Sequence, residues 1–420
     1  MRRSWRCRLE FREATLPNGL EIVAECNPRA YTTGLAFFVK TGSRDETAEI
    51  AGVSHFLEHM TFKGTPRRSA ADVNRELDEI GSNSNAFTSE EQTVYYATVL
   101  PEYQGHALDL LADIMRPSLR LDDFETEKQV IIEEIHKYDD QPPFGAHEKC
   151  MAAFFQDHPL GNSILGTVES VDNLSAAAMK TYFQQRYSPG NMTLAAAGRV
   201  GFDALVEDAK KWCGDWPACE TSRETAKVVG RKHFEALQKE SATQEYVVQV
   251  ACGPSADEVE RYASRILCTI LGDDTGSRFY WELIETGLAE YAGVGPYEFQ
   301  GAGILMTYLC CDPANAEQNL ERILQIQRQL ETGGITDSEL EIAKNKICSH
   351  VVRQSERPSN RLFGVGNGWI QRHSYQSVQE RLAAYQKVNI ADIERILQKY
   401  PMSTNTTVAV GPLNQFAAPS

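Results

Sequence analysis

The run His55-Phe56-Leu57-Glu58-His59 decides both the local fold and the chemistry expected of this chain. Residues three and four apart share one side of a helix, so the two imidazoles and the carboxylate should face the same way. Two imidazoles at this spacing can bind one metal ion, and a glutamate beside them can act as a general base. The run therefore predicts a helix that carries part of a metal site.

We expect this helix to span about residues 52–63. On a helical wheel Phe62 joins the His/Glu side, whereas Val53, Leu57 and Met60 lie opposite and can pack into a core. An apolar back and a His/Glu front favour a helix that holds a polar ligand. The alternative is a pair of buried histidines satisfied by hydrogen bonds, with the glutamate in solvent.

A catalytic zinc site needs a third protein ligand and an open fourth position, and residues 121–138 can supply the ligand. This segment predicts a second helix with one apolar stripe, formed by Phe124, Ile131, Ile135 and Tyr138. Glu127 and Glu134 flank the stripe, whereas Glu133 points to the solvated side. Because inward carboxylates are costly unless paired or metal-bound, Glu134 is the expected ligand, and Glu127 suits orientation of a ligand histidine. Alternatively, both acids lie at the stripe edge in contact with water.

Three stretches carry a family resemblance: H-F-L-E-H-M-x-F-K-G-T from His55, G-S-x-x-N-A-F-T-S-x-E-x-T-V-Y-Y from Gly81, and E-x-E-K-x-V-I-I-E-E-I from Glu125. The chain resembles the pitrilysin family of H-x-x-E-H zinc peptidases, the inverzincins, and most closely its mitochondrial-processing-peptidase-like branch. Order and spacing match from Leu16 to about Val200. The resemblance implies one zinc ion per chain, with His55, His59 and Glu134 as its ligands. It also implies that Glu58 is the general base and Glu127 the supporting acid.

The implied activity is zinc-dependent hydrolysis of peptides or short unfolded segments by an endopeptidase, with Glu58 activating the attacking water. The resemblance also implies that Asn85 and Ala86 bind the substrate backbone as part of an extended strand. Periodicity alone is equally consistent with an ordinary edge strand. Two other functions stay open. The chain could be a catalytically silent peptide-binding or scaffold subunit of a heteromeric peptidase, or a structural zinc protein, although structural zinc sites are usually rich in cysteine.

A chain of 420 residues is too long for one ordinary core, so we expect two domains. The expected fold class is α+β, with two homologous domains, each an antiparallel-rich sheet packed with helices. By resemblance, these form half of a clamshell chamber. The expected boundaries are 1–214 for the metal-binding catalytic domain, 215–232 for a linker, and 233–420 for a noncatalytic domain that lacks the H-x-x-E-H motif.

In the resembled family the second domain also contributes an arginine and a tyrosine to the substrate. Aligned on residues 287–289, these two positions hold Leu283 and Glu290 here. Tyr291 lies one residue late, which reverses the side-chain face in a strand, and it stays open whether Tyr291 or Arg278 substitutes. The missing pair predicts a homodimer, or a heterodimer with a homologous subunit that supplies it. Alternatively, a homodimer or monomer is competent with other residues.

Composition limits the remaining functions. A net charge of −16 without a basic patch argues against nucleic acid as a partner. The charge could attract basic peptides, or it could serve solubility alone. Ten cysteines without a C-x-x-C motif are typical of reduced thiols, so we expect a cytoplasmic protein. No apolar run of about 18 residues is present, and we expect no membrane span.

Overall fold

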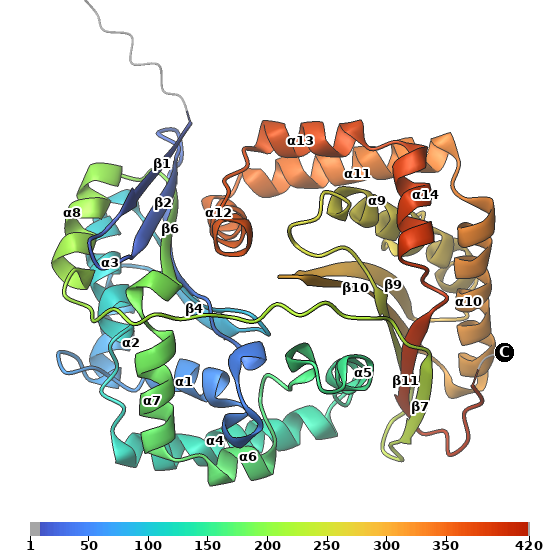
Figure 1. The fold of residues 1–420 in the computed structure, drawn as a ribbon, viewed down its shortest axis with the longest axis horizontal. Coiled ribbons are helices and arrows are strands. Elements are labelled where there is room, and N and C mark those ends of the chain that lie inside the picture. The colour runs from blue at the N-terminus through green and yellow to red at the C-terminus, as the bar shows by residue number, and fades with distance from the viewer. Residues whose placement is uncertain (1–8, 419–420) are drawn as a thin grey trace, which may run out of the picture. The chain divides into compact units, whose positions relative to one another are not determined.

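The computed structural model describes residues 9–418, which form a mixed α/β protein with two β-sheets (Figure 1). The chain divides into two compact units. Of the described residues, unit 1 contains 9–135, Ser163–Arg223 and Arg353–Gln376, and unit 2 contains His136–Asn162, Glu224–Val352 and 377–418. The two-sheet α/β architecture confirms the expected fold class, whereas the clamshell chamber stays a prediction.

The sheet of unit 1 has six strands in the order β1-β2-β6-β3-β5-β4. Strands β2 and β6 are parallel, and the other neighbours are antiparallel. Strand β4 is an edge strand. The bounds in chain order are β1 Glu10–Thr15, β2 Glu21–Cys26, β3 Thr33–Val39, β4 Asn83–Thr88, β5 Thr93–Val99 and β6 Met192–Gly198.

The sheet of unit 2 has five strands in the order β7-β11-β8-β10-β9, of which β7 and β11 are parallel. Counted along the chain, both sheets place their strands as first, fifth, second, fourth and third, apart from the additional β1. This shared topology confirms two domains of the same type. The bounds are β7 His233–Gln238, β8 Glu245–Cys252, β9 Tyr291–Phe299, β10 Ala302–Cys311 and β11 Asn405–Gly411.

Helices cover both faces of each sheet, and central strands such as β3 are therefore buried on both sides. Unit 1 contains α1 Val53–Thr61, α2 Ala70–Glu79, α3 Gln104–Ile114, most of α4 Leu121–Asp140, α6 Val168–Asn173, α7 Ala176–Arg186, α8 Phe202–Cys213 and α12 Pro358–Arg372. Unit 2 contains α5 Ala146–Phe155, the π-helical turn Tyr280–Ile284, α9 Arg261–Gly272, α10 Ala316–Gly333, α11 Asp337–Ser355, α13 Val378–Lys387 and α14 Ile390–Lys399.

Two helices pack on the sheet of the other half of the sequence. Helix α12 belongs to unit 1, where its Leu362 and Val365 contact the face of the sheet that contains Phe38. Helix α5 belongs to unit 2, where Cys150 packs with residues of β8, β10 and β11. The compact units therefore differ from contiguous domains in these exchanged segments, and the unit boundary after Arg223 lies inside the segment 215–232.

The helices of the described residues are short or polar relative to a bilayer. Within residues 9–418 none is long and apolar enough to cross a membrane.

Candidate metal centre

Helix α1 presents the two histidines on the side away from the core. Val53 and Leu57 are fully buried, and Met60 is almost so, which confirms the expected apolar back of the helix. The imidazoles of His55 and His59 lie 4.7 Å apart between ring centroids and meet edge to face. The spacing of the motif thus places both rings over one point beside the helix.

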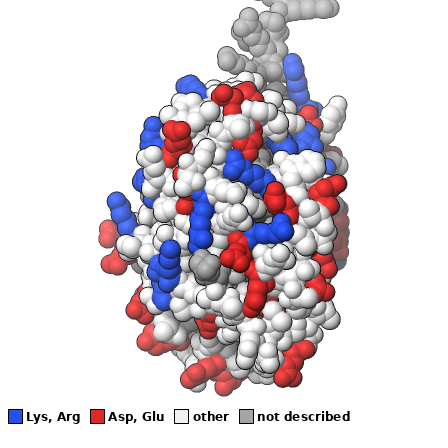
Figure 2. Space-filling view, turned by 90° about the vertical axis from the view of Figure 1, so that its right-hand side faces the viewer, with Lys and Arg blue, Asp and Glu red and all other residues white. Residues whose placement is uncertain are grey.

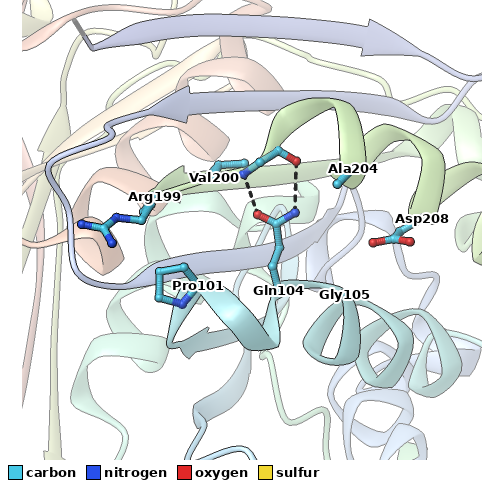
Figure 3. A pocket seen from close by; sticks show the side chains of 8 residues that line it. Pro101, Gln104, Gly105, Arg199, Val200, Ala204 and Asp208 are labelled. Atoms are coloured by element: carbon cyan, nitrogen blue, oxygen red, sulfur yellow. Dashed lines mark hydrogen bonds between the residues drawn. The ribbon is translucent and has the colours of Figure 1, made fainter. Parts of the chain in front are cut away.

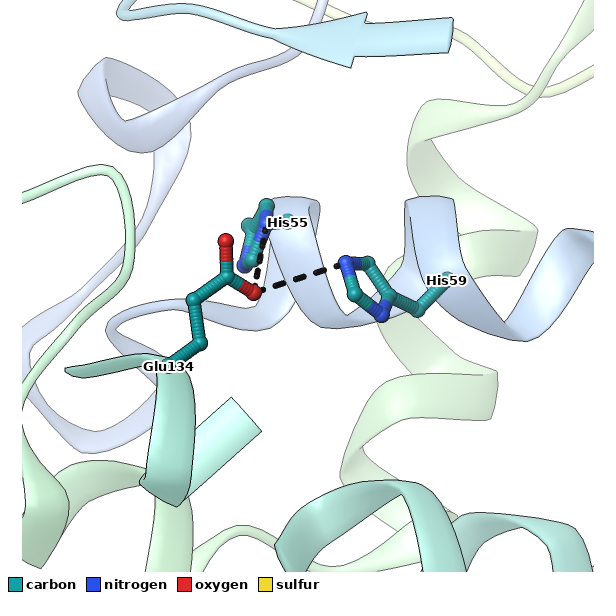
Figure 4. A group of neighbouring side chains, drawn as sticks. All are labelled: His55, His59 and Glu134. Atoms are coloured by element: carbon teal, nitrogen blue, oxygen red, sulfur yellow. Dashed lines mark ion pairs between the residues drawn. The ribbon is translucent and has the colours of Figure 1, made fainter. Parts of the chain in front are cut away.

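Helix α4 brings the third side chain to the same place. The Oε2 atom of Glu134 lies 3.7 Å from Nε2 of His55 and 3.7 Å from Nε2 of His59. Figure 4 shows the two histidines on one helix and Glu134 reaching toward them from another. One ligand atom from each residue lies within 4.8 Å of the others, so the three side chains can hold a metal ion.

The acidic and apolar side chains of α4 lie as the helical wheel predicts, except for Tyr138. Glu133 is exposed, whereas Glu127 is 4% exposed and faces inward. Phe124, Ile131 and Ile135 are buried as expected, but Tyr138 is 57% exposed. The expectation for Tyr138 was wrong because the core that covers α4 ends at Ile135.

Glu127 fixes the orientation of one imidazole. One carboxylate oxygen of Glu127 lies 2.8 Å from Nδ1 of His59, and the other lies 2.5 Å from Nζ of Lys63. With Nδ1 donating to this carboxylate, His59 presents Nε2 as a lone-pair donor toward Glu134. Glu127 therefore lies where an orienting acid is expected.

His55 is the more deeply buried of the two imidazoles, at 8% exposure. Burial, and then the neighbouring His59, lower the pKa of His55 to about 3. The imidazole is thus neutral at physiological pH, which is the form that binds metal.

Glu58 lies beside the three candidate ligands and is held by a residue that the sequence did not single out. The hydroxyl of Thr88 donates to Oε2 of Glu58 at 2.6 Å. Burial raises the pKa of Glu58, while Thr88 and His59 oppose that shift. Thr88 closes the N-A-F-T run at the end of β4, and its side chain alternates onto the same face as Ala86. This alternation is the sequence signal that could have found it.

The two residues expected to bind substrate lie on the edge strand β4. Asn85 is exposed, and its Oδ1 accepts a hydrogen bond from the backbone of Ala86 at 2.8 Å. Ala86 is 9% exposed, and its methyl group packs into the core on the α1 side. Their contact with a substrate stays a prediction.

The residues near the missing Arg/Tyr pair lie in unit 2. Arg278 binds Glu339 at 2.8 Å and the carbonyl oxygen of Gly334 at 3.0 Å. Tyr291 opens β9 and is 49% exposed. Leu283 is fully buried and Glu290 is exposed. Neither a leucine side chain nor an ionised carboxylate can donate a hydrogen bond to a peptide carbonyl.

A separate hollow of about 440 Å³ lies in unit 1 between the loop after β6 and the start of α3 (Figure 3). The side-chain amide of Gln104 bridges the backbone of Gly201, accepting from its N–H at 2.8 Å and donating to its carbonyl at 3.1 Å. Among the described residues that line it, Asp208 is the one carboxylate, and none is a histidine or cysteine. This hollow therefore offers no second metal site.

Two imidazoles, a carboxylate and a neighbouring glutamate on two helices are typical of the H-x-x-E-H metallopeptidases. Residues 21–168 match the family model "Insulinase (Peptidase family M16)", and residues 173–347 match "Peptidase M16 inactive domain". The chain belongs to peptidase family M16. The mitochondrial-processing-peptidase-like branch within it stays a prediction.

Relatives and solved structures agree with this membership. An uncharacterized zinc protease of Mycobacterium tuberculosis is 31% identical over 96% of this chain and 93% of the relative. The uncharacterized zinc protease YmxG of Bacillus subtilis is 32% identical over 91% and 93%, respectively. The fold matches a protease from Helicobacter pylori with a TM-score of 0.89, at 23% identity over 96% of this chain and 100% of that chain. The relatives' names support a zinc peptidase as the general function.

Proposed function

We propose that this chain is a zinc-dependent endopeptidase that hydrolyses peptides or short unfolded segments, with Glu58 as the general base. The observation that carries the proposal is the convergence of His55, His59 and Glu134 from two helices, with the Glu58 carboxylate beside them. Family membership and the names of the relatives support the same activity.

The donor set suits zinc. Two neutral imidazole nitrogens and one carboxylate oxygen are the ligands of many catalytic zinc sites, which leave one position open. Both Nε2 atoms lie at equal distances from the Glu134 carboxylate, and the other nitrogen of His59 is occupied by Glu127. We therefore propose His55, His59 and Glu134 as the ligands of one zinc ion.

A zinc ion held there would polarise the scissile carbonyl and lower the pKa of a water molecule. Glu58 accepts the proton of the attacking water at Oε1, the carboxylate oxygen that Thr88 does not hold. The same oxygen then delivers this proton to the leaving amine nitrogen. The partly buried position of Glu58 raises its pKa, which brings it closer to the pH at which a base can both accept and return a proton.

The edge strand β4 is the proposed site for the peptide backbone. An extended peptide that pairs with β4 as an additional strand would gain main-chain hydrogen bonds with little sequence preference. Asn85 and Ala86 lie on this strand, as does Thr88, which holds the base. Binding along β4 would thus place the peptide next to the proposed catalytic side chains.

The proposed assembly is a homodimer, or a heterodimer with a homologous subunit that supplies the missing arginine and tyrosine. The involvement of Arg278 with Glu339 and Gly334 supports a source other than Arg278. Mass measurement under native conditions, with an activity assay alone and with a homologous subunit, tests this point. The proposal includes a cytoplasmic location, supported by the free thiols of the described cysteines.

The alternative is a silent peptide-binding subunit, and it is favoured by the absence of the Arg/Tyr pair from the aligned positions. Acidic and basic side chains are mixed on the face seen in Figure 2, and no basic patch there suggests nucleic acid as a partner.

Purified protein should bind one zinc ion and cleave a quenched fluorescent peptide, and a chelator should abolish cleavage. Glu58→Gln should keep zinc binding and lose cleavage. Equal activity of this variant would remove Glu58 as the base, and a zinc-loaded wild type without cleavage would favour the silent subunit.

A further inference from the structure

The two ligand histidines are supported in different ways. Nδ1 of His59 is bonded to Glu127 at 2.8 Å. Nδ1 of His55 is buried and has no hydrogen-bond partner within residues 9–418. Ligand histidines are usually oriented by a partner at the second ring nitrogen. Beyond its edge-to-face contact with His59, the position of the His55 ring therefore depends on the backbone that carries it.

That backbone is the first turn of α1, which begins without a capping side chain of its own. The N-cap residue is Gly52, with φ +90°, and a Cβ atom there would lie 2.4 Å from the carbonyl oxygen of Leu165. The N–H groups of Gly52 and Ser54 instead donate to the two oxygens of Glu46, at 2.6 and 2.7 Å. A distant carboxylate thus caps this turn and also suits the positive end of the helix dipole.

A second contact fixes the same turn from another side. The hydroxyls of Ser54 and Tyr182 lie 2.7 Å apart, and that of Tyr182 lies 2.6 Å from Oγ1 of Thr41. Ser54 directly precedes His55, so the ring position of His55 depends on a peptide unit that is bonded at both its backbone and its side chain.

Glu46 is itself a fixed anchor. Its side chain is buried, with the residue 7% exposed. The preceding residue, Asp45, is ion-paired with Arg186 at 2.6 Å and with Arg223 at 2.5 Å. The loop that carries Glu46 is thereby held on α7 and on the segment after α8. A carboxylate on such a loop can define where the helix begins.

We propose that Glu46 is the positioning residue for His55, acting through the backbone of the first turn of α1, as Glu127 acts on His59 through its imidazole. This inference rests on the proposed zinc site. Without the Glu46 carboxylate, two N–H groups of the turn lose their acceptor, and Nε2 of His55 is no longer held at its position 3.7 Å from Glu134. The metal affinity should fall although no ligand has changed.

The test compares Glu46→Gln with Glu49→Gln, which removes the same charge from an exposed residue of the short 3₁₀ helix Ala48–Ile50. Zinc affinity is measured at about pH 8 by competition with a chromophoric chelator, and the visible absorption spectrum is recorded for the cobalt(II)-loaded protein. Glu46→Gln should bind zinc about tenfold or more weakly and should shift the cobalt spectrum. Glu49→Gln should match the wild type in both. The spectrum reports ligand geometry in folded, loaded molecules, so a general loss of stability would not shift it.

A folded Glu46→Gln variant with wild-type zinc affinity and spectrum would overturn the inference. If this variant does not fold, Glu46→Asp decides, because it keeps the charge but withdraws the carboxylate by one methylene group. Weaker zinc binding with a shifted spectrum in Glu46→Asp supports the inference, and wild-type values overturn it. A wild-type protein that binds no zinc would overturn the proposed function, and this inference with it.

Discussion

Replacing Glu127 by Gln probes how the site holds its second histidine. Glu127 is 4% exposed, and its carboxylate accepts from two donors at once, Nδ1 of His59 at 2.8 Å and Nζ of Lys63 at 2.5 Å. A glutamine has one acceptor oxygen and one NH₂ group, so it can accept from only one of these donors. The variant therefore keeps the size of the side chain but loses either the histidine bond or the lysine bond.

The expected loss follows from these contacts. Removing the partner of a ligand histidine typically lowers metal affinity about 10- to 100-fold, which is about 1.4–2.7 kcal/mol. The free energy of unfolding of the metal-free protein should fall by less than about 3 kcal/mol, the upper range for a hydrogen bond to a charged group. The side chain of Lys63 is 37% exposed, so its ammonium group can turn to water. The effect should thus appear mainly in zinc binding.

The assay is a competitive zinc titration of wild type, Glu127→Gln and the control Glu125→Gln, with urea unfolding of each metal-free protein. Glu125 lies on the same helix but is exposed, so its variant should bind zinc like the wild type. A Glu127→Gln variant whose zinc affinity stays within about twofold of both would refute the reasoning that an oriented imidazole is needed.

Two further outcomes follow from individual contacts. Thr88→Val should keep zinc affinity but lower kcat on a peptide about tenfold or more, because the Glu58 carboxylate loses its donor. Thr88→Ser keeps the hydroxyl and should retain most of kcat, and Thr98→Val on β5 is the matched control. A Thr88→Val enzyme with unchanged kcat would contradict the role of Thr88 in holding Glu58. Burial raises the pKa of Glu245 from 4.5 to about 7, so its contribution to stability is greatest below about pH 4.5 and is lost as the pH rises toward 7. The free energy of unfolding of Glu245→Gln relative to wild type should therefore rise by about 2 kcal/mol between about pH 5 and pH 8, and a pH-independent difference in chemical denaturation would argue against the raised pKa.

Much of the candidate metal site could be predicted from the sequence because it depends on helical periodicity. The side of α1 that carries His55 and His59, and the choice of Glu134 over Glu133, follow from which residues are three or four apart. Strands β3 and β6 are short, mostly apolar runs that are buried throughout, a pattern that favours buried strands from sequence alone.

The remaining features depend on contacts between distant segments. Periodicity says that α5 and α12 have apolar faces, but not that each packs on the sheet of the other half of the sequence. Thr88 reaches Glu58 only through the placement of β4 next to α1, and Glu46 caps a helix from six residues before it through a folded loop. Tyr138 was predicted wrongly for a related reason. Its helical spacing continues the apolar stripe of α4, but the core ends before Tyr138, whose side chain is exposed.

The claim that α1 and α4 jointly hold one zinc ion is tested most directly by comparing the zinc affinities of Glu134→Gln and Glu133→Gln. Both substitutions remove one negative charge. Glu134 lies 3.7 Å from Nε2 of each imidazole, whereas the neighbouring Glu133 is exposed. The account predicts that zinc affinity falls steeply in Glu134→Gln and is nearly unchanged in Glu133→Gln. Equal affinities, or a loss confined to Glu133→Gln, would contradict it.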